Sequence, residues 1–236
     1  FEPCHANSQV ILEALAARAR KGVRVRVLLD AFMPDRKTEK AFADFFSAHG
    51  IELRWYNQGS GVNFRTHIKL IVADGKRYLT GGRNVADEYF GLYRGHNFID
   101  RDVLVSGASA RQAQASFDNM WDHRLSKPAA GSGKFAGWES FCPASEAKRV
   151  KKIRAHLAAR GKALVQGIPS RSCGRVEFLA DKPASMLLEP DVQNYERYAE
   201  SRGKVTSAAM LRFMKGARAK LGFENWSFMP HESMKL

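Results

Sequence analysis

The order of helical and extended segments near the start of the chain most strongly restricts its fold. Apolar residues recur at helical spacing over 8–21, and residues 23–30, VRVRVLLD, alternate as in a strand. A second helix is expected over 38–49 and a second strand over 51–56. Because parallel strands need a crossover connection, this order predicts a parallel pair with helices packed on the sheet.

The pattern changes in residues 65–84, RTHIKLIVADGKRYLTGGRN. The runs 66–73 and 76–82 read as strands, and Asp-Gly between two such runs is a strong β-hairpin signal. A short helix is expected over 84–91, a strand over 98–107 and an amphipathic helix over 109–125. Together these elements predict an α/β fold with a mixed, mostly parallel sheet flanked by helices.

The second half of the sequence has a different character. A Pro-, Gly- and Ser-rich stretch over 126–145 is expected to be a boundary or loop. A very basic helix over 147–162, a strand over 175–181 and a last helix over 207–221 are expected after it.

His67 and Lys69 lie two residues apart in an expected strand and should therefore point to the same face. An imidazole beside an ammonium suits a phosphate ester. Imidazole can attack phosphorus or move a proton, and lysine can hold the non-bridging oxygens. The lysine charge should also lower the imidazole pKa and favour the neutral form that a nucleophile requires.

Three further features follow this pair. Asp74 is expected to support the hairpin turn rather than to meet substrate. Gly81 and Gly82 expose bare backbone at the hairpin's end, and a Gly pair running into a helix N-terminus can bind an anion. Asn84 is a candidate N-cap of that helix, with Asp87 three residues later, and its amide could also donate to a phosphate oxygen.

The segment HIKLIVAD resembles the H-x-K-x4-D motif of the phospholipase D superfamily. GGRN after it resembles the Gly-Gly-x-Asn form of cardiolipin synthases and related bacterial phospholipase D-like proteins. The resemblance continues through KGVRVRVLLD before the motif and through DEYFG, DRDVLVSG and SFDNMW after it, over about residues 8–125. A motif counts only in its structural context, and here the expected strands supply that context.

The resemblance implies transfer through a phosphohistidine, with two such motifs meeting across a pseudo-twofold axis. It assigns His67 as nucleophile or as its acid/base partner, and Asp74 as structural support. Lys69 and Asn84, with the Gly81–Gly82 pair, would bind the substrate phosphate.

Members of this superfamily also use a carboxylate on the following strand to orient a catalytic histidine. Asp100 and Asp102 are the candidates here, and they share a strand face, so parity does not separate them. Asp100 is the preferred assignment.

The chain contains only one such motif, although ARAKLGFENWSFMP resembles the opening strand of a second catalytic half. The expected organisation is a first catalytic half over 1–125, an inter-half linker or insert with the basic helix over 126–205, and the start of a truncated second half over 206–236. The second half would come from the same full-length chain or from a homodimer partner. This chain by itself is expected to have little or no activity.

The resemblance implies phosphatidyl transfer between phospholipids with a glycerol-type alcohol as acceptor. Hydrolysis by a phospholipase D is the alternative, because only the second step differs. A superfamily nuclease or a basic module that binds nucleic acid is a further alternative. No cofactor and no metal is expected, because the mechanism needs none and no cluster has ligand spacing.

The net charge of +14 favours anionic partners, and the 147–162 helix carries seven Lys or Arg residues and no acid. That helix is either a solvated face or a face for anionic lipid headgroups. The partners expected are thus a phospholipid, an alcohol acceptor and an anionic membrane surface, with nucleic acid as the rival. No apolar run reaches the length of a membrane span. The expected location is peripheral, at the cell envelope or the periplasmic face of a bacterial inner membrane.

The three cysteines, Cys4, Cys142 and Cys173, fit no metal site, and their odd number is no disulfide framework. A Cys142–Cys173 pair in an oxidising compartment is left open.

Overall fold

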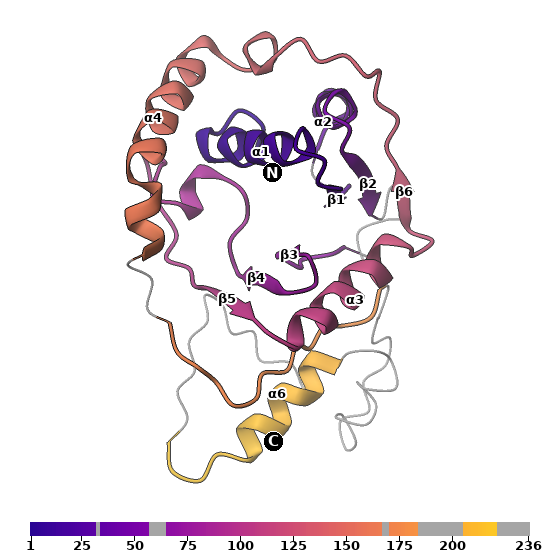
Figure 1. The fold of residues 1–236 in the computed structure, drawn as a ribbon, viewed down its shortest axis with the longest axis vertical. Coiled ribbons are helices and arrows are strands. Elements are labelled where there is room, and N and C mark those ends of the chain that lie inside the picture. Colours follow the sequence, from indigo (N-terminus) through magenta and orange to yellow (C-terminus); the bar gives the residue numbers. More distant parts are fainter. Residues whose placement is uncertain (32–33, 57–64, 167–169, 184–204, 221–236) are drawn as a thin grey trace.

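The computed structural model describes residues 1–31, 34–56, 65–166, 170–183 and 205–220 (Figure 1). Its strands form two three-stranded sheets, ordered β1-β2-β6 and β3-β4-β5. The α/β class with mixed strands and flanking helices is confirmed. The expectation of mostly parallel pairing is wrong for the described strands. Only β1 and β2 run parallel, because the hairpin and the later strands return antiparallel.

The first sheet is built from the helix–strand repeat that opens the sequence. Strand β1 (Arg26–Asp30) pairs in parallel with β2 (Glu52–Tyr56), with α2 (Arg36–Ala48) as the crossover. Helix α1 (Ala6–Ala19) precedes them. Asp35 begins α2 as its N-cap by accepting a hydrogen bond from the Thr38 amide at 2.7 Å. The predicted crossover is thus confirmed.

The main core lies between these two helices and this sheet. It is rich in aromatic side chains, and the ring of Phe42 packs edge-on against Trp55 and Trp138. Trp138 belongs to the short 3-10 helix η3 (Trp138–Ser140). Residues beyond 125, where a boundary was expected, therefore complete the core of the first part of the chain.

Strand β6 (Ser126–Pro128) was not expected from the sequence. It pairs antiparallel with β2, and the Ala129 amide continues the ladder by donating to the Leu53 carbonyl at 3.0 Å. Its composition gives no strand signal. The open edge of β2 supplies the hydrogen-bonding partners, so pairing here is decided by tertiary contact.

The second sheet contains the predicted hairpin. Strands β3 (Leu70–Ala73) and β4 (Arg77–Gly81) pair antiparallel, and β5 (Asp102–Ser106) adds to β4. At the turn, Asp74 and Gly75 both have left-handed backbones, with φ of 56° and 60°. Primed hairpin turns require this conformation, which Asp-Gly tolerates well. Helix α3 (Ser109–Trp121) covers one face of this sheet through Tyr78, Ala110 and Ala113.

Three expected elements differ in the structure. The strand expected from residue 66 begins only at Leu70, and the helix expected over 84–91 shortens to the 3-10 turn η2 (Asp87–Tyr89). Residues 175–181 form no strand. Their Phe178 instead packs on the ring of Tyr78 and donates its amide to the Gln112 side chain, so α3 rather than a strand provides the partner.

Two further helices surround these sheets. Helix α4 (Ala144–Gln166) lies beside α1, and α6 (Val205–Lys215) lies near the lower end of the molecule in Figure 1. Among the described residues, no helix is both long enough and apolar enough to span a bilayer. Residues 57–64, and most of the segment ARAKLGFENWSFMP that resembles the opening strand of a second half, lie outside the described residues.

The disulfide joins Cys4 to Cys142, and Cys173 is a free, exposed thiol. A Cys142–Cys173 pair is therefore wrong. Cys142 ends the segment after η3, which packs on the main core, and the N-terminal segment with Cys4 packs against the same core. Proximity in the fold, not spacing in the sequence, decides the pairing.

Candidate active site

His67 and Lys69 lie in an irregular segment, residues 65–69, which leads directly into β3. Asp30, the last residue of β1, holds the start of this segment. Its carboxylate accepts from the Thr66 amide at 2.7 Å and lies 3.8 Å from the Arg65 guanidinium. The carboxyl end of a parallel strand therefore fixes where the His-Lys pair begins.

Two hydrogen bonds fix Lys69. Its ammonium donates to the carbonyl oxygen of His67 at 2.8 Å, and its own carbonyl accepts from the Thr80 hydroxyl at 2.8 Å. Thr80 belongs to β4, so the hairpin partner strand anchors the Lys69 backbone. The Lys69 side chain is half-buried, whereas His67 is exposed.

The local electrostatics favour neutral His67. The pKa of His67 lies below its usual value, chiefly because its surroundings displace water, and the charges of Lys69 and Arg65 lower it further. Asp30 opposes this shift. The expected effect of Lys69 has the right direction, but desolvation is the larger cause. A neutral imidazole beside an ammonium can attack phosphorus or accept a proton.

Lys69 is itself a perturbed group. Burial lowers its pKa most, and Arg65 lowers it further, whereas Asp100 and Asp30 raise it. The carboxylate at the end of β1 and the Asp100 carboxylate before β5 therefore act on the same ammonium. This arrangement keeps a partly desolvated cation next to the imidazole, where it can bind a phosphate oxygen.

The Gly81–Gly82 pair allows β4 and β5 to approach closely. A Cβ on Gly81 would lie 2.5 Å from the Arg101 carbonyl oxygen and 2.8 Å from Asp102 Cα. A Cβ on Gly82 would lie 2.7 Å from an Asp100 carboxylate oxygen. Both glycines are needed for space, and neither has a left-handed backbone.

The two candidate carboxylates, Asp100 and Asp102, have different partners in the structure. Asp102 pairs with Arg83, at 2.5 Å between carboxylate oxygen and Nε. Asp100 instead lies over Gly82 and acts on Lys69. Of the two candidates, Asp100 is thus the carboxylate that acts on Lys69, and its role in orienting a histidine remains a prediction.

Asn84 does not cap a helix, so that part of the expectation is wrong. Its side-chain amide donates to the Tyr89 hydroxyl at 2.9 Å, and the residue before the short turn η2 is Ala86, with no side-chain cap. Asp87 is fully buried and turns toward α1, where its carboxylate accepts from the Ala6 and Asn7 amides. The N-terminus of a longer helix attracts this carboxylate more than a single 3-10 turn does.

Sequence reasoning missed Asp30, and it considered Arg83 only as an ion-pair partner of Asp100 or Asp102. Besides its pair with Asp102, Arg83 donates to the carbonyl oxygens of Asp100, at 2.6 Å, and Tyr89. The motif treats the position of Arg83 as variable, so nothing in the pattern assigns this residue to the site. Asp30 carried a usable signal, because ligands in α/β sheets bind at the carboxyl ends of parallel strands.

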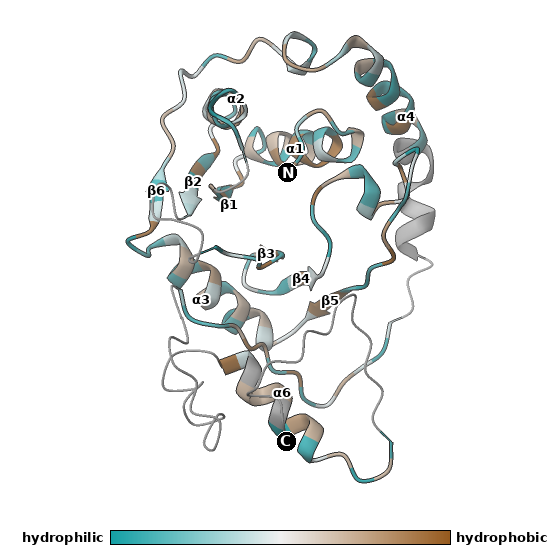
Figure 2. Ribbon diagram, turned by 180° about the vertical axis from the view of Figure 1, so that it is seen from behind, coloured by the Kyte–Doolittle hydropathy of each residue, from teal (hydrophilic) through white to brown (hydrophobic). Residues whose placement is uncertain are grey.

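An exposed apolar row borders the site on the sheet face away from α3. Ile71, Leu79 and Leu104 lie opposite one another across the three strands and are 56%, 36% and 60% exposed. The next row on the same face is the Gly81–Asp102 pair. Figure 2 shows the hydrophobic colour on β3 and β5 at this place. The end of the hairpin at Gly81 therefore lies beside apolar surface.

Comparison with known proteins gives relatives that match about half of the chain. A cardiolipin synthase from Geobacillus kaustophilus is 34% identical over 120 residues, covering 48% of this chain and 24% of the relative. Cardiolipin synthase C of Escherichia coli is 32% identical over 132 residues, covering 49% and 27%. An uncharacterized protein of Helicobacter pylori is 33% identical over 141 residues, covering 52% and 27%. The chain thus spans about a quarter of the length of these relatives.

One solved structure, a phospholipase D family member, Nuc from Salmonella typhimurium, is 20% identical with a TM-score of 0.39, covering 51% of this chain and 73% of that chain. The family model described as "Cardiolipin synthase, PLD-like domain" matches residues 3–121, which include the whole His67–Asn84 segment. Because this match takes in half of the chain, the protein belongs to the phospholipase D-like family of cardiolipin synthase domains.

Proposed function

We propose that this chain supplies one catalytic half of a phosphatidyltransferase. His67 acts as the nucleophile or as the acid/base partner, Lys69 and the Asn84 amide bind the substrate phosphate, and Asp100 orients a histidine. The observation that carries the proposal is the placement of Lys69, whose ammonium donates to the His67 carbonyl and is acted on by the Asp100 carboxylate, which lies against Gly82. In the first step one imidazole forms a bond to phosphorus, the bond between phosphorus and the leaving alcohol oxygen breaks, and the partner histidine protonates that oxygen. In the second, the partner histidine takes the proton of the incoming alcohol, whose oxygen bonds to phosphorus as the phosphorus–nitrogen bond breaks.

A phospholipid is the substrate that fits this site best. The Ile71–Leu79–Leu104 row offers apolar surface beside the phosphate-binding residues, which suits the glycerol backbone and upper acyl chain of a lipid. Curated relatives with this domain carry the name cardiolipin synthase. A glycerol-type alcohol is therefore the acceptor we propose, and hydrolysis is the alternative when water takes its place.

The reaction needs a second histidine, which this chain does not provide in a second H-x-K motif. We propose that a second catalytic half supplies it, from the same full-length protein or from a homodimer partner. In this organisation residues 1–125 form the first half, 126–205 the insert, and 206–236 the start of the second half. The chain alone should then turn over little substrate.

Helix α4 is proposed to rest on an anionic membrane surface. Arg149 and Arg154 form ion pairs with Asp87 and Glu13, so they hold α4 on the molecule. Lys148, Lys151 and Lys152 lie at helical spacing and are exposed. Each such lysine contributes about 1 kcal/mol near anionic headgroups. The Cys4–Cys142 disulfide fits an oxidising compartment, and we propose a peripheral location at the cell envelope.

Trapping the covalent intermediate tests the proposed reaction. The protein expressed from its complete natural gene is mixed with phosphatidylglycerol, quenched in alkaline detergent, and digested for mass spectrometry. A phosphatidyl group on the peptide containing His67, absent in His67→Asn, identifies the nucleophile. If the group is found on another histidine and His67→Asn slows its release, His67 is the acid/base partner. The matched control is Lys76→Gln, an exposed lysine of the hairpin turn.

The products distinguish the remaining activities. Diphosphatidylglycerol indicates transfer, and phosphatidic acid indicates hydrolysis. Cleavage of DNA without any lipid product would refute the lipid assignment. For the membrane surface, replacing Lys148, Lys151 and Lys152 by Gln should weaken binding to anionic vesicles about 100-fold. The same replacement of Lys21, Lys76 and Lys127 should have a much smaller effect.

A further inference from the structure

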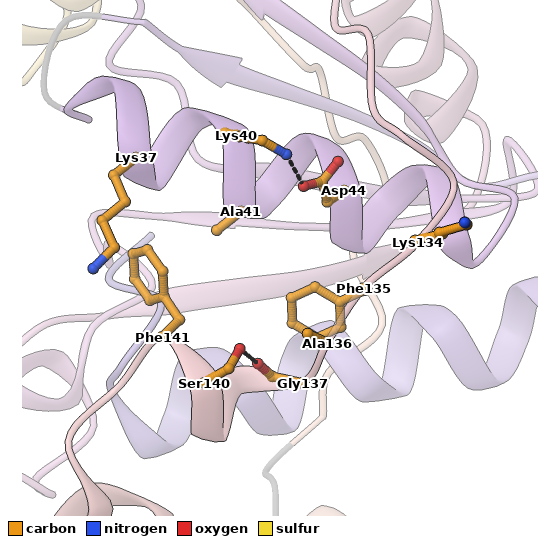
Figure 3. Close-up of a pocket in the computed structure, with 10 residues that line it drawn as sticks. All are labelled: Lys37, Lys40, Ala41, Asp44, Lys134, Phe135, Ala136, Gly137, Ser140 and Phe141. Carbon is orange, nitrogen blue, oxygen red and sulfur yellow. Dashed lines mark hydrogen bonds and ion pairs between the residues drawn. The ribbon is translucent and has the colours of Figure 1, made fainter.

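A cavity lies between α2 and the segment that follows β6, and none of its lining residues belongs to β3, β4 or β5. Its volume is about 400 Å³, which is within the range of small-molecule sites. Figure 3 shows one face of α2 on one side and residues 134–141 on the other. The cavity is therefore distinct from the His67–Lys69 site.

The lining carries a positive charge. Lys37, Lys40 and Lys134 line the cavity, and Asp44 is the one carboxylate among the lining residues. The Asp44 carboxylate forms an ion pair with the Lys40 ammonium, at 2.5 Å. Lys37 and Lys134 form no ion pair within the part of the chain that the structure describes. Two uncompensated ammonium groups in one cavity favour an anionic ligand.

Lys37 is held at one end of this cavity. Its ammonium lies 4.9 Å from the centroid of the Phe141 ring, a cation–π distance. Lys40 is one turn further along the same face of α2, and its bond to Asp44 uses one of the three ammonium donors. An anion between Lys37 and Lys40 would therefore find free donors on both side chains.

The opposite wall is apolar and already ordered. Phe135 packs edge-on against Phe45 and Trp138, with centroids 5.2 Å and 4.7 Å apart. Asp44 also accepts from the amide and hydroxyl of Ser132, at 2.8 Å and 2.7 Å, which holds this segment against α2. The wall needs little rearrangement to receive an apolar group, so little ordering entropy opposes binding.

We propose that this cavity binds an amphiphilic organic phosphate. The phosphate lies between Lys37 and Lys40, and a short apolar chain lies along Ala41 and Phe135 toward Lys134. This site goes beyond the proposed reaction and does not depend on it. A lipid is favoured over a nucleotide because the Ser140 hydroxyl already donates to Gly137 and the rest of this wall offers aromatic and methyl surface.

Calorimetry with the purified chain tests the proposal. The titrant is dihexanoyl phosphatidic acid below its micelle concentration, and all proteins carry Lys69→Gln to remove phosphate binding at the His67 site. Three comparison titrants separate the contributions. Inorganic phosphate lacks the chains, dihexanoyl phosphatidylcholine is zwitterionic, and adenosine monophosphate carries a base.

Lys37→Gln should weaken phosphatidic acid binding about tenfold, which is the loss of one charge-assisted contact. Lys134→Gln, at the far end, should cause a smaller loss, and Lys76→Gln should leave binding within about twofold. Phosphatidic acid should bind more tightly than all three comparison titrants. Unchanged binding in Lys37→Gln would overturn the site. Equal or tighter binding of inorganic phosphate or adenosine monophosphate would overturn the ligand class.

Discussion

At the scale of single residues, the protonation of His67 depends on charged groups on both sides of it in the chain. Lys69 and Arg65 repel a proton on its ring, and Asp30 attracts one. Asp30 also holds the backbone of the segment through Thr66. One carboxylate thus positions the His-Lys pair and limits how far the histidine pKa falls.

The titration of His67 tests this balance. The pKa of folded His67 is lowered, so at a pH between that value and the ordinary 6.5 the unfolded chain binds more protons. This histidine therefore stabilises the fold less as the pH falls through 6.5. By NMR, its midpoint should lie below 6.5, rise in Lys69→Met and fall further in Asp30→Asn. The midpoint of His123 serves as the control and should not move. A His67 midpoint that stays the same in both variants contradicts the coupling.

At the scale of elements, the end of the hairpin determines what can lie beside β5. The atoms nearest to a Cβ on Gly81 include backbone atoms of Arg101 and Asp102 besides the Asp102 carboxylate, whereas the nearest atoms to a Cβ on Gly82 belong to the Asp100 carboxylate. A backbone neighbour cannot move without shifting the strand, but a carboxylate can rotate. The two adjacent glycines should therefore respond differently to the same substitution.

The pair Gly81→Ala and Gly82→Ala gives a matched comparison. Gly81→Ala should lower the free energy of unfolding by about 1–3 kcal/mol, because β4 and β5 must separate. Gly82→Ala should change it by less than about 0.5 kcal/mol. It should nevertheless reduce phosphatidyl transfer by the complete protein about 100-fold, because Asp100 is displaced from Lys69. Denaturant unfolding and the transfer assay measure the two effects. Similar stability losses in both variants would refute the distinction.

At the scale of the whole molecule, α4 is attached to the catalytic part through a buried charge. The carboxylate of Asp87 is fully buried and lies 2.6 Å from the Arg149 guanidinium. The same carboxylate accepts two amides at the start of α1. Nearby, the disulfide ties Cys4 to Cys142, which lies close before the first residue of this helix, Ala144. The N-terminal helix, the turn η2 and α4 therefore form one connected unit.

Removing the Arg149 guanidinium should lower the free energy of unfolding. Arg149→Met leaves Asp87 charged and buried with only the α1 amides as partners, and should lower the free energy of unfolding by about 2–4 kcal/mol. Lys151→Met, on the exposed side of the same helix, should change it by less than about 0.5 kcal/mol. Urea unfolding of the two variants measures the difference. Equal effects would mean that the ion pair does not hold α4.

The Cys4–Cys142 disulfide should contribute a large part of the free energy of unfolding. Its two cysteines are 138 residues apart, and closing so long a loop restricts the unfolded chain by about 4–5 kcal/mol in the entropic account. The Cys4→Ser/Cys142→Ser double variant and reduction of the native protein should both lower the unfolding midpoint. Cys173→Ser should leave it unchanged. No change on reduction, with the free thiols confirmed by labelling, would show that the bond contributes little.

The sequence predicted local features well where local chemistry decides them. The Asp74–Gly75 turn, the crossover helix α2 and the closeness of His67 and Lys69 follow from backbone preferences and short spacing. It failed for β6, for the Asn84 cap and for the disulfide. Strand β6 depends on the edge of β2, and the disulfide on Cys4, both far away in the chain. The cap fails because Asn84 bonds to the nearby Tyr89 hydroxyl, while Asp87 bonds to amides at the distant start of α1.

The sequence by itself determined the motif residues and the hairpin that presents them, because two-residue spacing and a turn dipeptide are local constraints. Only the tertiary structure decided how those residues are supported. In the fold, Asp30 at the end of β1 bonds to the Thr66 amide, and Asp102 pairs with Arg83, which leaves Asp100 to act on Lys69. Asp87 bonds to the start of α1 and to Arg149. These charged groups pair because separate helices and strands pack against one another. Periodicity in the sequence predicts each element but not which elements will be in contact.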